Sequence, residues 1–244
     1  MKKIVGVIPA RLESTRLARK MLRDLLGKSL IQRTYENARK AVSLSDVIVA
    51  CDDEEIKRAV EAFGGKAWLT SQEHTSGTSR IAEVAQKINT DVIINIQGDE
   101  PLMDASAIDL LASAFSGPTD FHVATLAIRK ENEPEYENPN VVKVVTDSDD
   151  FALYFSRTPI PHFRDHRFRG FLKHLGIYAY TRHFLLNEWH QLKPSVLEES
   201  EKLEQLRILD NGFKIKVLLT TQDSIGVDTE DDLKKVEQVL QQGA

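Results

Sequence analysis

The chain has 244 residues, of which 28% are charged, with a formal net charge of −5 and one cysteine. This length predicts one large α/β domain, and the acidic balance argues against a general nucleic-acid binder, which usually carries a basic excess. Cys51 cannot form an intramolecular disulfide, so we expect it to pack in a buried strand of a protein kept in a reducing compartment.

The N-terminal apolar segment, residues 4–8, predicts the first buried strand. It is followed at once by Pro9 and Arg11. Five apolar residues are too few for the core of a signal peptide and far too few to span a bilayer. We therefore expect a cytoplasmic protein with no membrane partner.

The first half of the chain alternates strand-like and helix-like segments, a pattern typical of βαβ units and a mainly parallel sheet. Ser29-Leu-Ile-Gln32 is a capping-box pattern that opens a helix. Gly64-Gly65 ends another helix. Strands are predicted at residues 4–8, 46–51, 66–69 and 92–96, and helices at 29–40, 52–64, 79–88 and 105–115.

The alternation changes after residue 120. Strand candidates then follow one another without helices of normal length between them, at residues 122–128, 141–146, 152–156 and 174–180. A helix with apolar spacing is predicted over residues 197–209, a strand over 213–219, and a last helix from Thr229 to about Leu240. The sequence thus predicts a single domain over residues 1–244. It has a mixed, mostly parallel central sheet flanked by helices and an antiparallel, strand-rich insertion at about residues 120–180.

A basic loop follows the first strand and holds Arg11, Arg16 and Lys20. A triphosphate needs several positive partners of this kind. The loop lacks both the P-loop pattern and the Gly-x-Gly-x-x-Gly pattern of dinucleotide sites. A solvated basic helix start accounts for the spacing equally well.

Two carboxylates follow predicted strands. Asp99 comes just past residues 92–96, and Asp228 lies between the strand at 213–219 and the last helix. Ligands and metals bind at the carboxyl ends of strands in open α/β sheets, and Mg²⁺ is often held by one or two carboxylates with substrate phosphates. Together the two residues predict a magnesium site. Asp228 taken alone also suits the N-cap of the last helix.

Other polar groups are weaker candidates. Ser76, Gly77 and Thr78 precede a helix, where the backbone could approach a ligand or form an ordinary connection. Arg157 suits a substrate carboxylate. The side chains of His174, Tyr178, Glu204 and Gln205 offer hydrogen bonds of the kind a sugar needs. The histidines show no zinc-ligand spacing.

Taken in order, these motifs resemble the CMP-Kdo synthetases, the 3-deoxy-manno-octulosonate (Kdo) cytidylyltransferases. The resemblance runs through nearly the whole chain. It is carried by Ile8-Pro-Ala-Arg-Leu-x-Ser-Thr-Arg-Leu17, Ser76-Gly-Thr78, Ile96-Gln-Gly-Asp-Glu-Pro-Leu102, Asn138-Pro-Asn-Val-Val-Lys143, Tyr154-Phe-Ser-Arg157, Pro159-Ile-Pro161, His174-Leu-Gly-Ile-Tyr178 and Glu201-Lys-Leu-Glu-Gln-Leu-Arg207.

The resemblance implies a GT-A-like, Rossmann-like nucleotidyltransferase fold and a homodimer. It implies the reaction of CTP with Kdo to give CMP-Kdo and pyrophosphate, for lipopolysaccharide assembly. It also implies roles for single residues. Arg11, Arg16 and Lys20 would contact CTP phosphates, and Arg11 and Lys20 would act in catalysis with the Mg²⁺ ligands Asp99 and Asp228. Ala10, Ser76, Thr78 and Gln97 would lie around the cytosine and sugar sites, and Arg80, Gln97, Arg157, His174, Tyr178, Glu204 and Gln205 would surround Kdo.

Two positions depart from the family pattern. Ser79 stands where relatives usually carry an acidic residue, and Ala18-Arg19 stands where they usually carry Pro-x. The first departure leaves a different sugar acid open, such as 8-amino-Kdo or sialic acid. The second predicts a less rigid loop. A non-catalytic nucleotide-binding regulator is the alternative from another class.

Overall fold

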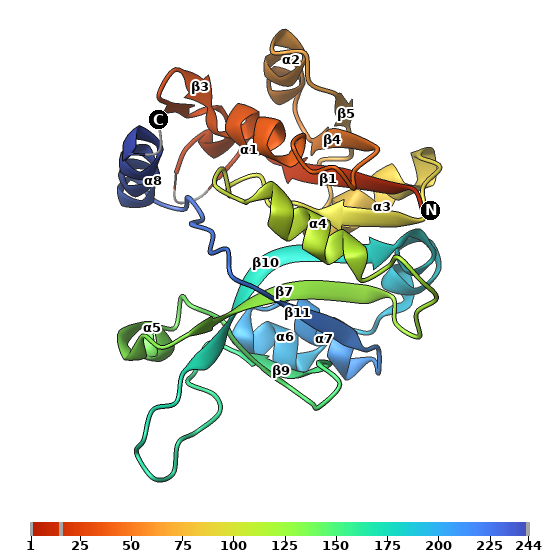
Figure 1. Ribbon diagram of the computed structural model, residues 1–244. Coiled ribbons are helices and arrows are strands. Elements are labelled where there is room, and N and C mark those ends of the chain that lie inside the picture. Colours follow the sequence, from red (N-terminus) through yellow and green to blue (C-terminus); the bar gives the residue numbers. More distant parts are fainter. Residues whose placement is uncertain (1, 15–16, 243–244) are drawn as a thin grey trace.

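The computed structural model describes residues 2–14 and 17–242. Within them, nine strands form one sheet, whose main path runs in the order β11-β7-β10-β6-β1-β4-β5. A separate two-stranded antiparallel sheet is formed by β2 (Asp24–Leu25) and β3 (Lys28–Ser29). Figure 1 shows the helices packed on the faces of the central sheet.

The parallel half of the sheet contains the strands predicted from the first 100 residues. Its members are β1 (Ile4–Ala10), β4 (Asp46–Cys51), β5 (Ala67–Leu69) and β6 (Val92–Asn95). β1 pairs in parallel with both β4 and β6. These strands are apolar on both faces because helices cover both sides.

The other half contains the predicted antiparallel excursion, but it is not a separate insertion. Its strands are β7 (Val123–Lys130), β8 (Lys143–Thr146), β9 (Ala152–Ser156), β10 (Phe171–Thr181) and β11 (Ile215–Thr220). β10 pairs antiparallel with both β6 and β7, so it joins the two halves into one sheet. The mixed, mostly parallel α/β prediction is confirmed.

Two apolar cores lie on opposite faces of the sheet. One contains side chains of α1 (Leu30–Ala38), α2 (Glu54–Ala62) and α4 (Ala105–Ser113). The other contains side chains of α3 (Gly77–Lys87), the π-helical turn η2 (Phe184–Glu188), the short helix η3 (Trp189–Gln191) and α7 (Gln205–Asp210). A third cluster packs α8 (Glu230–Gln242) against Leu17 and Leu30.

The single helix predicted over residues 197–209 is wrong, because the segment forms α6 (Val196–Glu201) and α7. Lys202 adopts a left-handed conformation with φ of 53° and its N–H is bonded to the carbonyl of Glu198, which ends α6. Apolar spacing alone does not reveal such a break, since Leu203 and Leu206 continue the pattern and are both buried. The break places Glu204 at the N-terminus of α7.

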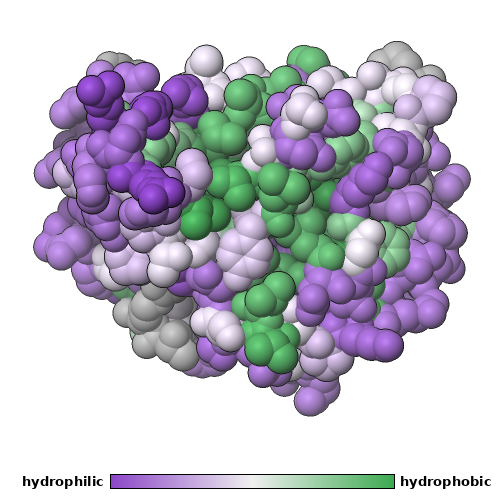
Figure 2. All heavy atoms as spheres, turned by 90° about the horizontal axis from the view of Figure 1, so that it is seen from below, coloured by the Kyte–Doolittle hydropathy of each residue, from purple (hydrophilic) through white to green (hydrophobic). Residues whose placement is uncertain are grey.

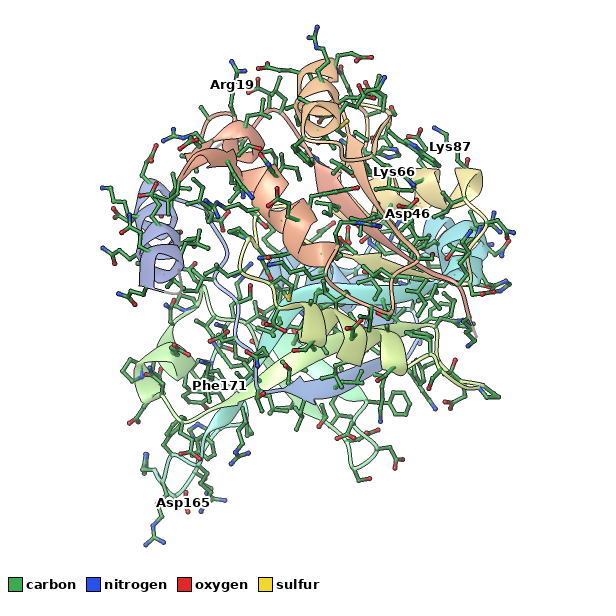
Figure 3. The ribbon with its side chains drawn as sticks, turned by 45° about the horizontal axis from the view of Figure 1, so that its top comes forward. Arg19, Asp46, Lys66, Lys87, Asp165 and Phe171 are labelled. Carbon is green, nitrogen blue, oxygen red and sulfur yellow. The ribbon has the colours of Figure 1, made fainter. Side chains whose placement is uncertain are left out.

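A long loop projects from the sheet between β9 and β10, as Figure 1 shows. Asp165 lies near its far end and Phe171 near its base in Figure 3. Tyr136 of α5 (Glu133–Glu137) contacts the rings of Phe163, Phe168 and Phe171, with centroids 5.4–5.6 Å apart. This aromatic cluster anchors the loop to the sheet.

The pairing of β10 with β7 is interrupted by a bulge. Leu175 opposes Leu126, but Tyr178 opposes Thr125, so Gly176 and Ile177 are extra residues on β10. A bulge bends a strand and redirects its side chains. No helix in the described part of the chain is long and apolar enough to cross a membrane.

Candidate functional site

A cavity of about 700 Å³ lies beside the carboxyl end of β6. Its walls are formed by the segment that follows β6, the bulged part of β10, the start of α7 and the segment that follows β11. Loop residues 140–142 form a further wall. The carboxyl ends of the neighbouring parallel strands β1, β4 and β6 meet at one edge of the sheet, where α/β folds bind ligands.

Lys20 lies between the two predicted metal ligands. It belongs to the short helix η1 (Lys20–Leu22), and its Nζ is 2.6 Å from Asp99 Oδ2 and 3.1 Å from Asp228 Oδ1. Burial alone would lower the pKa of Lys20, but the two carboxylates, Asp99 foremost, raise it above its usual value. The site therefore holds a charged ammonium between two carboxylates.

The backbone keeps these carboxylates together. The N–H of Val227 donates to the carbonyl oxygen of Asp99 over 2.8 Å, so the segment after β11 is tied to the segment after β6. Asp228 thus reaches Asp99 although the two are far apart in the sequence.

The chemistry of this donor set fits Mg²⁺. In the described residues, no group of three or more His, Cys, Asp or Glu side chains could hold a metal ion. Mg²⁺ does not need one, because it is commonly bound by one or two carboxylates with waters and substrate phosphates. The ammonium of Lys20 shows that Asp99 and Asp228 can share one cation.

Most of the residues predicted to surround the sugar line this one cavity. Gln97 donates its Nε2 hydrogen to the carbonyl oxygen of Gly176 over 3.1 Å, which fixes its amide beside the β10 bulge. The six that line it are Gln97, Arg157, His174, Tyr178, Glu204 and Gln205.

Arg157 is held by backbone carbonyls. Its Nε donates to the carbonyl oxygen of Glu201 over 2.7 Å and its Nη1 to that of Pro139 over 3.1 Å. Its own N–H donates to the carboxylate of Glu201 over 2.8 Å. The guanidinium is therefore fixed at the cavity wall, where it can bind a substrate carboxylate with paired hydrogen bonds.

His174 is partly buried, and its ring lies between aromatic rings. Its ring centroid is 4.9 Å from that of Phe155 and 5.4 Å from that of Tyr178, and its Nε2 is 3.1 Å from the hydroxyl of Thr125. Burial lowers the pKa of His174 to about 3. The imidazole is therefore neutral in the folded protein at neutral pH and serves as a hydrogen-bonding group.

This burial makes stability depend on pH. The folded pKa of about 3 lies below the ordinary 6.5, so the unfolded chain takes up the proton first as pH falls. The contribution is fully present above pH 6.5 and is lost between pH 6.5 and 3. From pH 6.5 to 5 the free energy of unfolding should fall by about 2 kcal/mol through His174.

Urea denaturation of the wild type and of His174→Gln at pH 7 and pH 5 measures this loss. Glutamine does not titrate, so the stability difference between the two proteins should shift by about 2 kcal/mol toward the variant at pH 5. An equal difference at both pH values would contradict the assignment.

Glu204 connects the cavity to the start of α3. The hydroxyl of Thr78 donates to its Oε1. Burial raises the pKa of Glu204, while hydrogen bonds from Ser76 and Thr78 oppose the shift. Gly77 lies against the end of β1, where an added Cβ would be 3.4 Å from Pro9 Cγ. The predicted Ser76 and Thr78 thus lie beside Glu204, and Ala10 is the last residue of β1. None of the three is among the residues that line the cavity.

Ser79 has a structural role. Ser76 caps α3 by accepting from the Ser79 N–H over 3.2 Å, and the Ser79 hydroxyl accepts from the Ser76 N–H over 3.3 Å. Serine thus replaces the acidic partner of a capping box. Ser79 does not line the cavity, so the replacement of the usual acidic residue by a neutral serine acts on the N-terminus of α3.

The placement of Arg80 beside the sugar is corrected by its contacts. Its guanidinium is fully buried, with Nη2 3.3 Å from Asp52 Oδ2 and Nη1 bonded to the Thr70 hydroxyl at 2.5 Å and to the Ser71 carbonyl at 3.2 Å. It does not line the cavity. The rotation of α3 directs it toward β4 and β5, which sequence spacing did not reveal.

Arg11 lies on the same side as Arg80. Burial lowers the pKa of Arg80, the carboxylate of Asp52 opposes this shift, and the positive charge of Arg11 lowers the pKa further. The N–H of Leu12, next to Arg11 in the chain, donates to Asp52 Oδ1 over 3.0 Å. Arg11, Asp52 and Gln72 line a second hollow of about 370 Å³. Arg16, predicted to bind phosphate with Arg11 and Lys20, lies outside the described residues.

Sequence reasoning missed residues that line the cavity and one residue, Lys143, that supports its wall from outside the lining. Lys143 is fully buried and its Nζ donates to the carbonyl oxygens of Asn138, Val141 and Arg157, so it fixes loop 138–142 against Arg157. Asn95 and Lys173 also line the cavity. Among these residues, a hint in the sequence existed only for Asn95, which is a polar residue in an otherwise apolar strand.

Comparison with known proteins gives the family. A family model described as cytidylyltransferase matches residues 5–215. A 3-deoxy-manno-octulosonate cytidylyltransferase of Geotalea uraniireducens is 48% identical over 245 residues, covering 96% of this chain and 97% of that protein. One from Fusobacterium nucleatum is 49% identical over 235 residues, covering 96% and 95%.

Comparison with solved structures agrees with this family. A CMP:2-keto-3-deoxy-manno-octonic acid synthetase complexed with CTP is 42% identical with a TM-score of 0.95, covering 99% of this chain and 100% of that one. The 4-diphosphocytidyl-2C-methyl-D-erythritol synthase of Anaerococcus prevotii, 16% identical with a TM-score of 0.65 over 98% and 99%, shares the fold. With the matched family model and relatives aligned over nearly their whole length, the chain belongs to the cytidylyltransferase family and, within it, to the 3-deoxy-manno-octulosonate cytidylyltransferases.

Proposed function

We propose that this chain, acting as one domain over residues 1–244, activates Kdo with CTP in a Mg²⁺-dependent reaction that yields CMP-Kdo and pyrophosphate. The observation that carries the metal assignment is the Lys20 ammonium held between Asp99 and Asp228 at the cavity. The product is the activated sugar for lipopolysaccharide assembly. The reaction is placed in the cytoplasm, in keeping with the buried, unpaired Cys51.

The reaction needs no covalent enzyme intermediate. The anomeric hydroxyl of Kdo attacks the α-phosphorus of CTP, and pyrophosphate leaves in line. The protein positions the reactants and stabilises charge. Arg157 binds the sugar carboxylate from the cavity wall, and neutral His174 with Tyr178 forms hydrogen bonds to the sugar.

Charge at the phosphates is balanced by the basic residues near the end of β1. Lys20 stabilises the departing pyrophosphate as a mobile point charge, and Arg11 and Arg16 clamp phosphate oxygens. Mg²⁺, held by Asp99 and Asp228, would supply a Lewis acid that acidifies the sugar hydroxyl and neutralises the α-phosphate. The buried Lys143 keeps the wall that carries Arg157 in place.

A homodimer is part of the proposal. Figure 2 shows apolar side chains gathered on the face of the molecule seen from below. In Figure 1 the strands β9 and β11 lie at this lower end of the sheet. Leu153 of β9 and Leu219 of β11 are 61% and 55% exposed. Such patches mark association surfaces. Light scattering should give twice the chain mass of 27.6 kDa.

Pyrophosphate release from CTP and Mg²⁺ tests the activity, with Kdo, 8-amino-8-deoxy-Kdo and sialic acid compared side by side. We expect Kdo to give the highest kcat/KM. A preference for another of these acids would keep the mechanism and overturn the sugar assignment. No release with any of them would contradict the catalytic proposal.

A further inference from the structure

Asn95 carries an unpaired polar atom in the core of the protein. It is the last residue of β6, follows three fully buried apolar residues and is itself 3% exposed. Its Oδ1 has no hydrogen-bond partner among the described residues. The great majority of buried polar side-chain atoms are bonded, so an unpaired one calls for a specific explanation.

The position of Asn95 in the sheet provides that explanation. It pairs in register with Tyr178 of β10, and both residues line the cavity. Gln205 lines the same cavity, is 7% exposed and has an unpaired Nε2. The cavity thus presents a buried acceptor and a buried donor without protein partners, and a hydroxyl group can satisfy both kinds of atom.

The asparagine is retained at a cost. An apolar side chain here would extend the run of Ile93 and Ile94 and pack beside Tyr178 and Tyr180, which belong to the same core as Ile93. An unpaired buried amide oxygen instead loses its hydration without compensation. A residue that lowers stability in the free protein and faces a ligand cavity is typical of a binding site.

We propose that Asn95 is a specificity-determining residue that recognises one hydroxyl group of the sugar acid in the cavity that it lines together with Gln205. This inference rests on the proposed function and identifies the part of the substrate that Asn95 recognises. The neutral amide adds no charge to a cavity that already contains Asp99 and Glu204, so it contributes hydrogen bonding alone.

Asn95→Leu in the full chain is the first test. We expect a melting temperature equal to or above that of the wild type, a KM for Kdo raised about 10-fold or more, and a KM for CTP within about twofold. Thr90→Val is the matched control, because the Thr90 hydroxyl, near the start of β6, is buried and bonded to the carbonyls of Lys3 and Val92. It should lower stability and leave the KM for Kdo unchanged.

The second test uses Kdo analogues that each lack one hydroxyl, at C4, C5, C7 or C8. With the wild type, removal of the recognised hydroxyl should lower kcat/KM about 10-fold or more, and with Asn95→Leu that same removal should have almost no further effect. Asn95→Ala, which adds no volume, carries the same comparison if the leucine variant does not fold.

Two results would overturn the inference while the proposed function stands. One is an equal loss of kcat/KM for every analogue in both the wild type and the variant, and the other is an unchanged KM for Kdo in Asn95→Leu. A wild-type protein that does not turn over Kdo would contradict the proposed function and the inference with it.

Discussion

Asp99→Asn should reduce kcat by about 10³-fold or more at moderate Mg²⁺, because a metal ligand at the reacting phosphate contributes several kcal/mol of charge stabilisation. The substitution removes one of the two carboxylates that hold the Lys20 ammonium and leaves a side chain of the same shape. The expected signature is a rate that recovers in part as Mg²⁺ is raised, since the remaining ligand Asp228 still binds the ion weakly. Pyrophosphate release measured over a Mg²⁺ series gives both quantities.

The matched control for Asp99→Asn is Asp231→Asn. Asp231 lies in the first turn of α8 with its side chain 84% exposed, so the substitution makes the same change of charge away from the cavity. Activity and Mg²⁺ dependence should match the wild type. Near-normal turnover by Asp99→Asn at moderate Mg²⁺ would show that Asp99 is not a metal ligand.

Lys20→Met should lower kcat by about 10²- to 10³-fold, the loss typical of removing one preorganised donor from a developing negative charge. Methionine matches the length of the lysine stem but leaves Asp99 and Asp228 facing each other without their ammonium. The KM for Kdo should change little, because Lys20 does not line the cavity with the sugar-binding residues. Steady-state kinetics with each substrate varied in turn separates these effects.

The same variant should also be less stable without Mg²⁺ than with it. Removing the buried Lys20 ammonium leaves the charge of the two partly exposed carboxylates uncompensated, and a divalent cation between them would compensate it. Lys66→Met is the control, since Lys66 forms a single ion pair with Asp46 on the surface and its side chain is 60% exposed. If Lys20→Met keeps wild-type kcat, Lys20 has no part in catalysis.

The carboxylate pair could be predicted from the sequence for a simple reason. Asp99 and Asp228 each follow a strand, but β6 and β11 are not neighbours, because β10 and β7 lie between them in the sheet. The segment after β11 brings Asp228 to Asp99, as the bond from Val227 to Asp99 shows. The contact of Lys20 with both could not be predicted, because it depends on the path of a loop ten residues beyond β1. The resemblance to a family indicated that Lys20 matters but not what it touches in the free protein.

The failures also have physical causes. The break at Lys202 was hidden because the apolar spacing continues through Leu203, so local periodicity could not show that Glu204 begins a new helix. Arg80 was placed with the sugar through the resemblance to the family, whereas the rotation of α3 directs its guanidinium toward Asp52. The pairing of β10 with β6 is a long-range contact, which no local pattern encodes.

The bulge in β10 restricts how the length of this segment can change during evolution. Side chains alternate between the two faces of a strand, so losing or gaining one residue between Leu175 and Tyr178 would turn every later side chain of β10 to the opposite face. Tyr178 would leave the cavity, and its place would be taken by Ala179 after a loss or by Ile177 after a gain. The projecting loop before Phe171 has no such constraint, since its length is not coupled to a register. Relatives of this protein should therefore differ in the length of that loop while keeping the residue count of the bulge.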